Sequence, residues 1–263
     1  MSRVLRTSAS AVVVLVVALL TLPLDAAAQL KVLMSGGFSG PYERLLPDFE
    51  RSTGIQVATA SGASQGTGPQ TIRAQLAAGA HADVVILSRE GLADLVAAGR
   101  IAIGTETDLA QTPLGVAVRA GAPKVDVGTV ESFKRVVTNA RSVSAPGSTS
   151  GIFVRDQVLP RLGIAEQVRL KTTPRGVEAA AMVAAGEADL AIMPVSEIVH
   201  APGVELGGVL AEELQLHQVF AAAVVAGTDQ LDAARRLIAF LASDGAASAI
   251  RSGGMEPVRA RRP

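Results

Sequence analysis

Short apolar segments alternate with amphipathic segments along the chain, and this alternation restricts the fold more than any other feature of the sequence. The apolar runs at 30–34 and 83–87 are typical of short strands. Each run is followed by a stretch with apolar residues at helical spacing, at 42–51 and 90–98, and glycine or proline separates the segments. Strands that alternate with helices in this way form a mainly parallel sheet with helices on its faces, so we expect an α/β fold.

The same alternation continues toward the end of the chain and divides it into two blocks. Further strands are expected at 55–59, 114–118, 142–145, 189–193 and 215–225, and further helices at 69–78, 130–139, 151–162, 177–185, 232–241 and 246–251. We predict two lobes, each with a mainly parallel sheet flanked by helices. The chain would cross from one lobe to the other twice. Lobe 1 would contain residues 29–118 and 222–263, lobe 2 would contain residues 119–221, and two crossover strands would form a hinge. A single doubly wound sheet is the alternative that the pattern leaves open.

Residues 1–28 have the three parts of a secretory signal peptide. A basic start precedes the apolar run at 9–22, and three alanines at 26–28 form a cleavage pattern before Gln29. A membrane anchor needs about 20 apolar residues, and this run is shorter and is closed by Pro23. We therefore expect cleavage before Gln29 and export to the periplasm.

The charge balance excludes some classes of partner. The chain has 24 basic and 24 acidic residues, which favours neither a nucleic acid nor an anionic membrane surface as a partner. It contains no cysteine, so no disulfide is expected.

Three loops share an order of features that suits the binding of a small anion. In each loop, at 34–38, 61–69 and 145–151, a strand is followed by a turn of small residues with hydroxyl groups and then by a helix. Ligands of open α/β sheets bind beyond the carboxyl ends of the strands, and the N–H groups at a helix start bind anions. Any one of these loops could be an ordinary turn with a helix cap, but the three together favour a ligand site.

Candidate cations lie near the starts of helices, at Arg73, Arg155 and Arg175. A guanidinium can bind a carboxylate through two parallel hydrogen bonds, although each of these side chains could equally lie on a solvated helix face. Arg175 is the strongest candidate, because it is next to a predicted helix start.

Signals for catalysis are weak in this sequence. The three histidines lack metal-ligand spacing, and the phosphate-binding P-loop motif is absent, so the sequence predicts no metal and no cofactor. Glu197 follows the strand at 189–193 and Tyr42 follows the first loop, and either could act as an acid or base. Capping or packing is the alternative role for both.

Several segments of the mature chain match a known family pattern, at 30–38, 60–64 through 76–79, 82–86, 149–153 and 186–192. In these segments the chain resembles the type II periplasmic solute-binding proteins, particularly the molybdate-binding branch of ABC transporter receptors. The resemblance implies two lobes that close on a small anionic ligand, a monomeric protein, and an inner-membrane ABC permease as a candidate partner.

The resemblance also implies which residues bind the ligand. The ligand positions of the family fall on the three loops and on the start of the helix at 177–185, and the candidates in this chain are Ser35, Gly36, Gly37, Ser64, Gln65, Gly66, Thr67, Ser148, Ser150, Arg175 and Val177. One position departs from the family, because the tyrosine of the molybdate receptors aligns with Pro194. That departure argues against molybdate and in favour of a carboxylate.

A sub-branch of the family that includes aconitate isomerase is similar in the first loop, Ser35-Gly-Gly-Phe38, and in its glycine-containing second loop. The sequence therefore leaves three functions open. It favours a periplasmic receptor for a di- or tricarboxylate or a molybdate-like oxyanion. The alternatives are an enzyme that interconverts cis- and trans-aconitate by an allylic proton shift, and a sensor with no role in transport.

Overall fold

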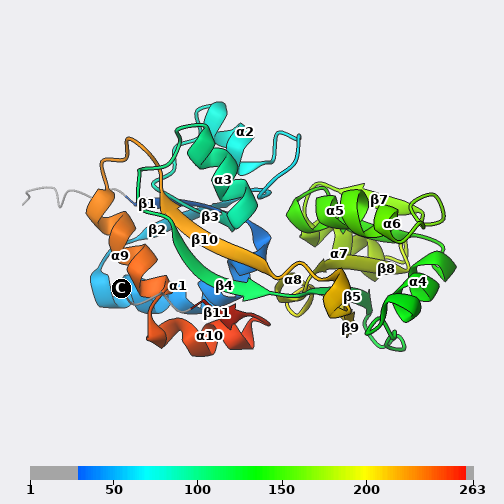
Figure 1. The fold of residues 1–263 in the computed structure, drawn as a ribbon. Helices are drawn as coiled ribbons and strands as arrows, with labels where there is room; N and C mark the ends of the chain where they lie inside the picture. Colours follow the sequence, from blue (N-terminus) through cyan, green and yellow to red (C-terminus); the bar gives the residue numbers. More distant parts are fainter. Residues whose placement is uncertain (1–28, 259–263) are drawn as a thin grey trace, which may run out of the picture.

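The computed structural model describes residues 29–258 as two lobes, each built around its own sheet (Figure 1). One sheet has six strands and the other has five. Two separate sheets confirm the predicted two-lobed α/β fold and rule out the single doubly wound sheet. The predicted signal peptide lies outside the described residues.

Lobe 1 is formed by both ends of the described chain. Its first part comprises β1 (Leu30–Met34), the short 3₁₀ helix η1 (Gly36–Phe38), α1 (Ser39–Thr53), β2 (Val57–Ser61), α2 (Ile72–Ala77), β3 (Val84–Ser88), α3 (Arg89–Ala97) and β4 (Thr107–Thr112). Its second part comprises β10 (Gln218–Val224), α9 (Leu231–Leu241), α10 (Ala247–Ser252) and β11 (Glu256–Pro257). The strand order is β11-β4-β10-β3-β1-β2, in which β1, β2 and β3 are parallel and β10 is antiparallel to β3 and β4.

Lobe 2 is formed by the middle of the chain. It comprises β5 (Leu114–Arg119), α4 (Val130–Asn139), β6 (Val143–Pro146), α5 (Thr149–Phe153), a π-helical turn (Val154–Val158), α6 (Leu159–Arg161), β7 (Leu170–Thr173), α7 (Gly176–Ala184), β8 (Leu190–Pro194), α8 (Val195–Ile198) and β9 (Val204–Val209). The strand order is β7-β6-β8-β5-β9. As in lobe 1, an antiparallel strand, here β5, is inserted beside the parallel ones.

Helices cover both faces of the sheet in lobe 1, which explains why its central strands β3 and β10 are mostly apolar without alternation. On one face, Val32 and Ile86 of the strands pack in a cluster with side chains of α1, α9 and α10. On the other face, Leu33 and Val85 pack in a cluster with side chains of α2 and α3. Successive residues of one strand therefore serve two hydrophobic layers, and Figure 1 shows these helices on opposite sides of the sheet.

The chain crosses between the lobes a few residues earlier than predicted. Only Pro113 separates β4 of lobe 1 from β5 of lobe 2, and the return crossover lies at 215–217, just before β10. The predicted boundaries at 118 and 221 are therefore wrong, because hydrogen-bonded ladders hold all of β5 in the second sheet and all of β10 in the first. The two crossovers are tied together by Gln215, whose amide accepts a hydrogen bond from Leu114 N at 2.8 Å and donates to Leu114 O at 3.0 Å.

Candidate functional site

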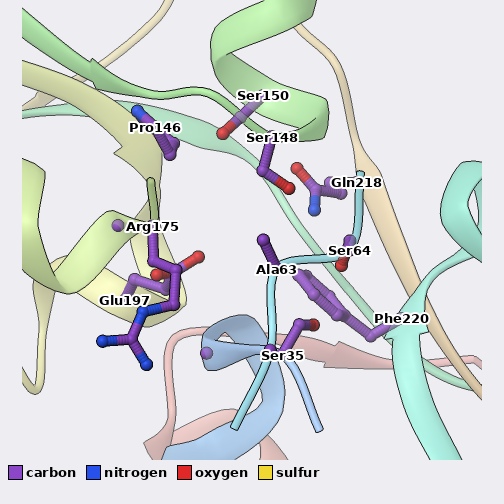
Figure 2. Close-up of a pocket in the computed structure, with 13 residues that line it drawn as sticks. Ser35, Ala63, Ser64, Pro146, Ser148, Ser150, Arg175, Glu197, Gln218 and Phe220 are labelled. Carbon is purple, nitrogen blue, oxygen red and sulfur yellow. The ribbon is translucent and has the colours of Figure 1, made fainter. Parts of the chain in front are cut away.

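The three predicted loops meet between the lobes, where they enclose a small cavity that we call the inner cavity (Figure 2). Lobe 1 contributes the loops after β1 and β2, and lobe 2 contributes the loop after β6. The inner cavity has a volume of about 20 Å³, and its walls carry the hydroxyl groups of four serines, Ser35, Ser64, Ser148 and Ser150. An outer cavity of about 540 Å³ adjoins it, and the two share Ser35, Gly36, Gly62, Arg175 and Glu197 as lining residues.

The lobe 1 loops hold two of these serines at the carboxyl ends of strands. Ser35 follows β1 directly, and its backbone N–H donates to Ile86 O of β3 at 2.8 Å, which extends the ladder by one bond. Its side-chain Oγ is buried and has no hydrogen-bond partner in the described part of the chain. Ser64 Oγ accepts a hydrogen bond from Ser88 N at 2.9 Å, so this hydroxyl still has a proton to donate to a ligand.

The lobe 2 loop contacts lobe 1 directly across the cleft. Gln65 N donates to Ser148 Oγ at 3.2 Å, and Thr149 Oγ1 donates to Gln65 Oε1 at 3.0 Å. Thr149 Oγ1 is also 2.7 Å from Ser88 Oγ, in a buried hydroxyl pair. These bonds hold the lobes together beside the inner cavity, in the manner of a closed solute-binding cleft.

Glu197 lies at the junction of the two cavities, on the short helix α8 that follows β8. A Cβ added to Gly36 would lie 2.9 Å from its Oε2, and one added to Gly176 would lie 2.0 Å away. These two glycines, one from each lobe, leave the space that the carboxyl group occupies. Within residues 29–258, no hydrogen bond to this carboxyl group is found, which leaves it available to a ligand.

The surroundings of Glu197 change its acidity. Burial is the main cause that raises the pKa of Glu197, the negative charge of Glu178 also raises it, and the positive charge of Arg175 lowers it, so that the resulting pKa is about 7. A carboxyl group with this pKa exists in both protonation states near neutral pH. It is therefore suited to take a proton from a ligand and to return it.

Among the three candidate arginines, only Arg175 lines the cleft. Arg175 precedes α7 and borders both cavities, and its Nη2 lies 2.6 Å from Glu178 Oε1. Arg73 is exposed on α2, and Arg155 is exposed and paired with its neighbour Asp156 at 2.6 Å. A positive charge is thus present at the cleft, but Arg175 already forms an ion pair with Glu178.

Tyr42 reaches the outer cavity from α1. Its hydroxyl is 2.7 Å from Thr59 Oγ1, and its ring is buried. Burial raises the pKa of Tyr42 to about 12, although the hydrogen bond with Thr59 lowers it and the charge of Glu50 raises it. The phenol is therefore protonated at neutral pH, so Tyr42 is suited to donate a proton or a hydrogen bond and not to act as a base.

The other predicted site residues lie apart from the inner cavity. Gln65, Gly66 and Thr67 line a separate cavity of about 250 Å³, so Ser64 is the one predicted ligand-binding residue of the second loop that lines the inner cavity. Gly37, within the first loop, packs against Phe220, because a Cβ added to Gly37 would lie 1.9 Å from the ring of Phe220. Val177 borders the outer cavity and is half exposed.

Gln218 and Phe220 also line the inner cavity, although they lie outside the loops and the helix start that the sequence predicted to form the site. Both lie on β10 and face the same side, as residues two apart on a strand do. Gln218 is 3% exposed, and its Oε1 has no hydrogen-bond partner among the described residues. The sequence contains a signal for Gln218, because its amide begins an otherwise apolar strand within the segment 215–225, which was predicted to cross between the lobes.

The geometry of two lobes, two crossovers and a cleft lined by hydrogen-bond donors agrees with a comparison to known families. The model of the bacterial extracellular solute-binding protein family matches residues 30–256. The chain belongs to this family. The predicted resemblance to the type II periplasmic solute-binding proteins is thereby confirmed.

Individual relatives include an enzyme and two binding proteins. The chain is 35% identical over 233 residues to an aconitate isomerase from Pseudomonas sp., which covers 88% of this chain and 89% of that protein. The periplasmic molybdate-binding protein of Azotobacter vinelandii superposes with a TM-score of 0.69 at 20% identity, over 89% of this chain and all of that one. The sulfate-binding protein SubI of Mycobacterium tuberculosis superposes with a TM-score of 0.65 at 20% identity, over 88% and 87% of the two chains. At this identity the two structures establish the shared fold alone.

Two further properties concern residues 29–258. No helix in this part of the chain has the length and apolar character needed to cross a membrane. The same residues contain no group of three or more His, Cys, Asp or Glu side chains that could hold a metal ion.

The raised pKa of Glu197 predicts how stability depends on pH. A glutamate in the unfolded chain ionises near pH 4.3, and Glu197 in the folded protein ionises near 7, so folding becomes less favourable as the pH rises through this window. Glu197→Gln removes the group, and we expect the variant to be more stable than the wild type by about 3 kcal/mol at pH 8 but not at pH 4. Urea unfolding at a series of pH values measures the difference. The exposed Glu205→Gln on β9 is the control, and a pH-independent difference for Glu197→Gln would contradict the assignment.

Proposed function

We propose that this protein is a periplasmic isomerase of aconitate, in which Glu197 moves a proton along the allylic system of the substrate. The observation that carries this proposal is the position of Glu197, an unpaired carboxyl group with a pKa near 7 at the junction of the two cavities. The aconitate isomerase of Pseudomonas sp., at 35% identity over most of both chains, supports the same activity. The sequence alone favoured a receptor, but binding does not require a carboxyl group of this kind facing an anion.

The chemistry needs a base and groups that stabilise negative charge. Ionised Glu197 takes a proton from the methylene group of trans-aconitate, and the electron pair left behind forms the new double bond. The old double bond shifts its electrons toward a carboxylate and takes a proton back at its far carbon, so the formula of the substrate is unchanged. Returning the proton from the same carboxyl group restores Glu197.

The cleft offers several groups that would bind the carboxylates of the substrate. The hydroxyl groups of Ser35, Ser64, Ser148 and Ser150 surround the inner cavity, and the free N–H groups at the start of α7 face it from lobe 2. Arg175 at the junction would bind a second carboxylate. The outer cavity of about 540 Å³ leaves room for the rest of a tricarboxylate, which the inner cavity alone could not hold.

Catalysis by Glu197 predicts different effects on binding and turnover. Glu197→Gln should lower turnover of trans-aconitate by about a hundredfold or more, since general base catalysis contributes about 10²–10⁴-fold. Binding should be retained, because the amide resembles the neutral acid in shape. Conversion to cis-aconitate, followed by proton NMR, should rise with pH and level off above a midpoint near 7 in the wild type, as Glu197 ionises. Glu205→Gln should be unchanged, and full turnover by Glu197→Gln would exclude Glu197 as the base.

A carboxylate ligand also predicts a specific dependence on Arg175. Arg175→Lys keeps the positive charge but loses the forked donor geometry, so affinity for trans-aconitate should fall about tenfold, as measured by calorimetry. Arg73→Lys, on the exposed face of α2, should have no effect.

Molybdate should bind more weakly than trans-aconitate, because Pro194 offers neither a hydroxyl group nor an N–H where molybdate receptors have a tyrosine. Tight molybdate binding without a response to aconitate would contradict the proposal.

The second candidate is a receptor for a small carboxylate that works with an inner-membrane ABC permease. Membership of the solute-binding family and the hydrogen bonds across the cleft favour it, because receptors of this family close on their ligands. Binding of trans-aconitate without any conversion by the wild type would establish this role and exclude the isomerase.

Export to the periplasm completes the proposal. It is supported by the basic start, apolar run and alanine cleavage pattern of residues 1–28 and by the extracellular family to which the chain belongs. Protein recovered from the periplasm should begin at Gln29 on N-terminal sequencing, within a residue or two. An intact Met1 in the cytoplasmic fraction would contradict export.

A further inference from the structure

Gln218 is a buried polar residue whose surroundings leave its amide unsatisfied. It is 3% exposed, and its Oε1 is buried with no hydrogen-bond partner in the described part of the protein. Buried polar groups in folded proteins are almost always paired, because an unpaired one loses its hydrogen bonds to water on folding. No hydrogen bond from its Nε2 to the described residues is found either. Rotation of the terminal group exchanges Nε2 and Oε1, so the donor end of this amide can face an anionic ligand in the cavity.

A second glutamine, Gln215, lies three residues earlier, and both ends of its side-chain amide form hydrogen bonds within the protein. Gln215 Oε1 accepts from Leu114 N at 2.8 Å, and its Nε2 donates to Leu114 O at 3.0 Å and to Leu210 O at 2.9 Å. Both of its polar atoms are thus used to join the two crossovers. Gln218 has the same side chain and lies on the same segment, but it is directed into the inner cavity.

The backbone of Gln218 is held at the point where both crossovers enter lobe 1. Gln218 is the first residue of β10 and pairs with Thr112, the last residue of β4. Figure 2 shows its amide between Ser148 of lobe 2 and Ser64 of lobe 1, facing the space that the serine hydroxyl groups surround. A ligand in this cavity would therefore contact the hinge strand itself, in addition to the loops of the two lobes.

The amide adds an uncharged side-chain donor from the hinge strand to the donors that the loops of the two lobes supply. The walls consist of serine hydroxyl groups and backbone N–H groups, the Arg175 guanidinium is paired with Glu178, and Glu197 is an acidic group. An amide N–H is a fixed, uncharged donor that cannot ionise, so its strength does not change with pH. It can bind an anionic oxygen without neutralising the nearby carboxyl group.

We propose that Gln218 is a ligand-binding residue that fixes a carboxylate of the substrate in the inner cavity by donating from Nε2 at the hinge strand. This inference rests on the proposed carboxylate substrate and adds a contact that sets its position relative to Glu197. Phe220, two residues later on the same face of β10, also lines the inner cavity. Gln218 is therefore a binding and positioning residue, and not the acid or base.

Two measurements on substituted proteins separate ligand binding from a structural role. Gln218→Met removes the amide at similar size, so thermal unfolding of the ligand-free protein should be unchanged or occur at a higher temperature. Gln215→Met, which breaks the bonds between the crossovers, should unfold at a lower temperature. The affinity of Gln218→Met for trans-aconitate, by calorimetry, should fall about tenfold. Gln111→Met, at an exposed position of the neighbouring strand β4, should change neither quantity.

Gln218→Glu provides a second variant of nearly the same shape as the wild type. It places a carboxylate where we infer a donor, so affinity should fall further than in Gln218→Met, by about a hundredfold. A melting temperature lowered as much as in Gln215→Met, with unchanged affinity in both Gln218 variants, would overturn the proposal and make Gln218 a structural residue.

The outcomes for Gln218 and for the isomerase can be told apart. Turnover of trans-aconitate by the wild type with unaffected Gln218 variants would sustain the isomerase and overturn the role of Gln218. Binding of trans-aconitate or citrate that depends on Gln218, without turnover, would sustain the role of Gln218 and overturn the isomerase. Binding of molybdate alone would overturn both.

Discussion

The double crossover between the lobes is the constraint on which the rest of the structure depends. Pro113 alone separates the last strand residue of one sheet from the first strand residue of the other, and the returning segment lies beside it. Gln215 ties the two segments through hydrogen bonds to both backbone groups of Leu114. Because the sheets are joined at this one place, the loops at the carboxyl ends of their strands face each other across a cleft.

In the function that we propose, the cleft holds an anionic substrate with few positive charges of its own. Of the residues that line its two cavities, Arg175 is the basic one, and it is paired with Glu178. Hydroxyl and N–H groups supply the remaining donors, which are weaker singly but need no counter-charge. The placement of Glu197 against an anion is costly for a receptor, and it becomes understandable if the carboxyl group exchanges a proton with the ligand.

Much of the fold could be predicted because it follows local patterns. β1 and α4 begin and end at the predicted residues, and the three hydroxyl-rich loops lie between the strands and helices expected around them. β4 and β9 were missed because they carry polar residues and glycines in place of a continuous apolar run. The crossovers were placed too late because β5 and β10 are apolar over most of their length, and an apolar run does not reveal which of two sheets it joins.

The sequence by itself determined the α/β class, the two blocks, the family resemblance and the serines of the cleft, because these depend on residues close together in the chain. Tertiary structure alone decided the chemistry of the site. The pKa of Glu197 depends on burial and on charges at 175 and 178, and the space for its carboxyl group depends on Gly36 of the other lobe. Gln215 and Gln218 likewise have identical side chains three residues apart, and only their long-range surroundings make one a structural tie and leave the other facing the cavity. Burial, electrostatic environment and unpaired hydrogen-bonding groups are properties of a position in space, which a linear pattern does not contain.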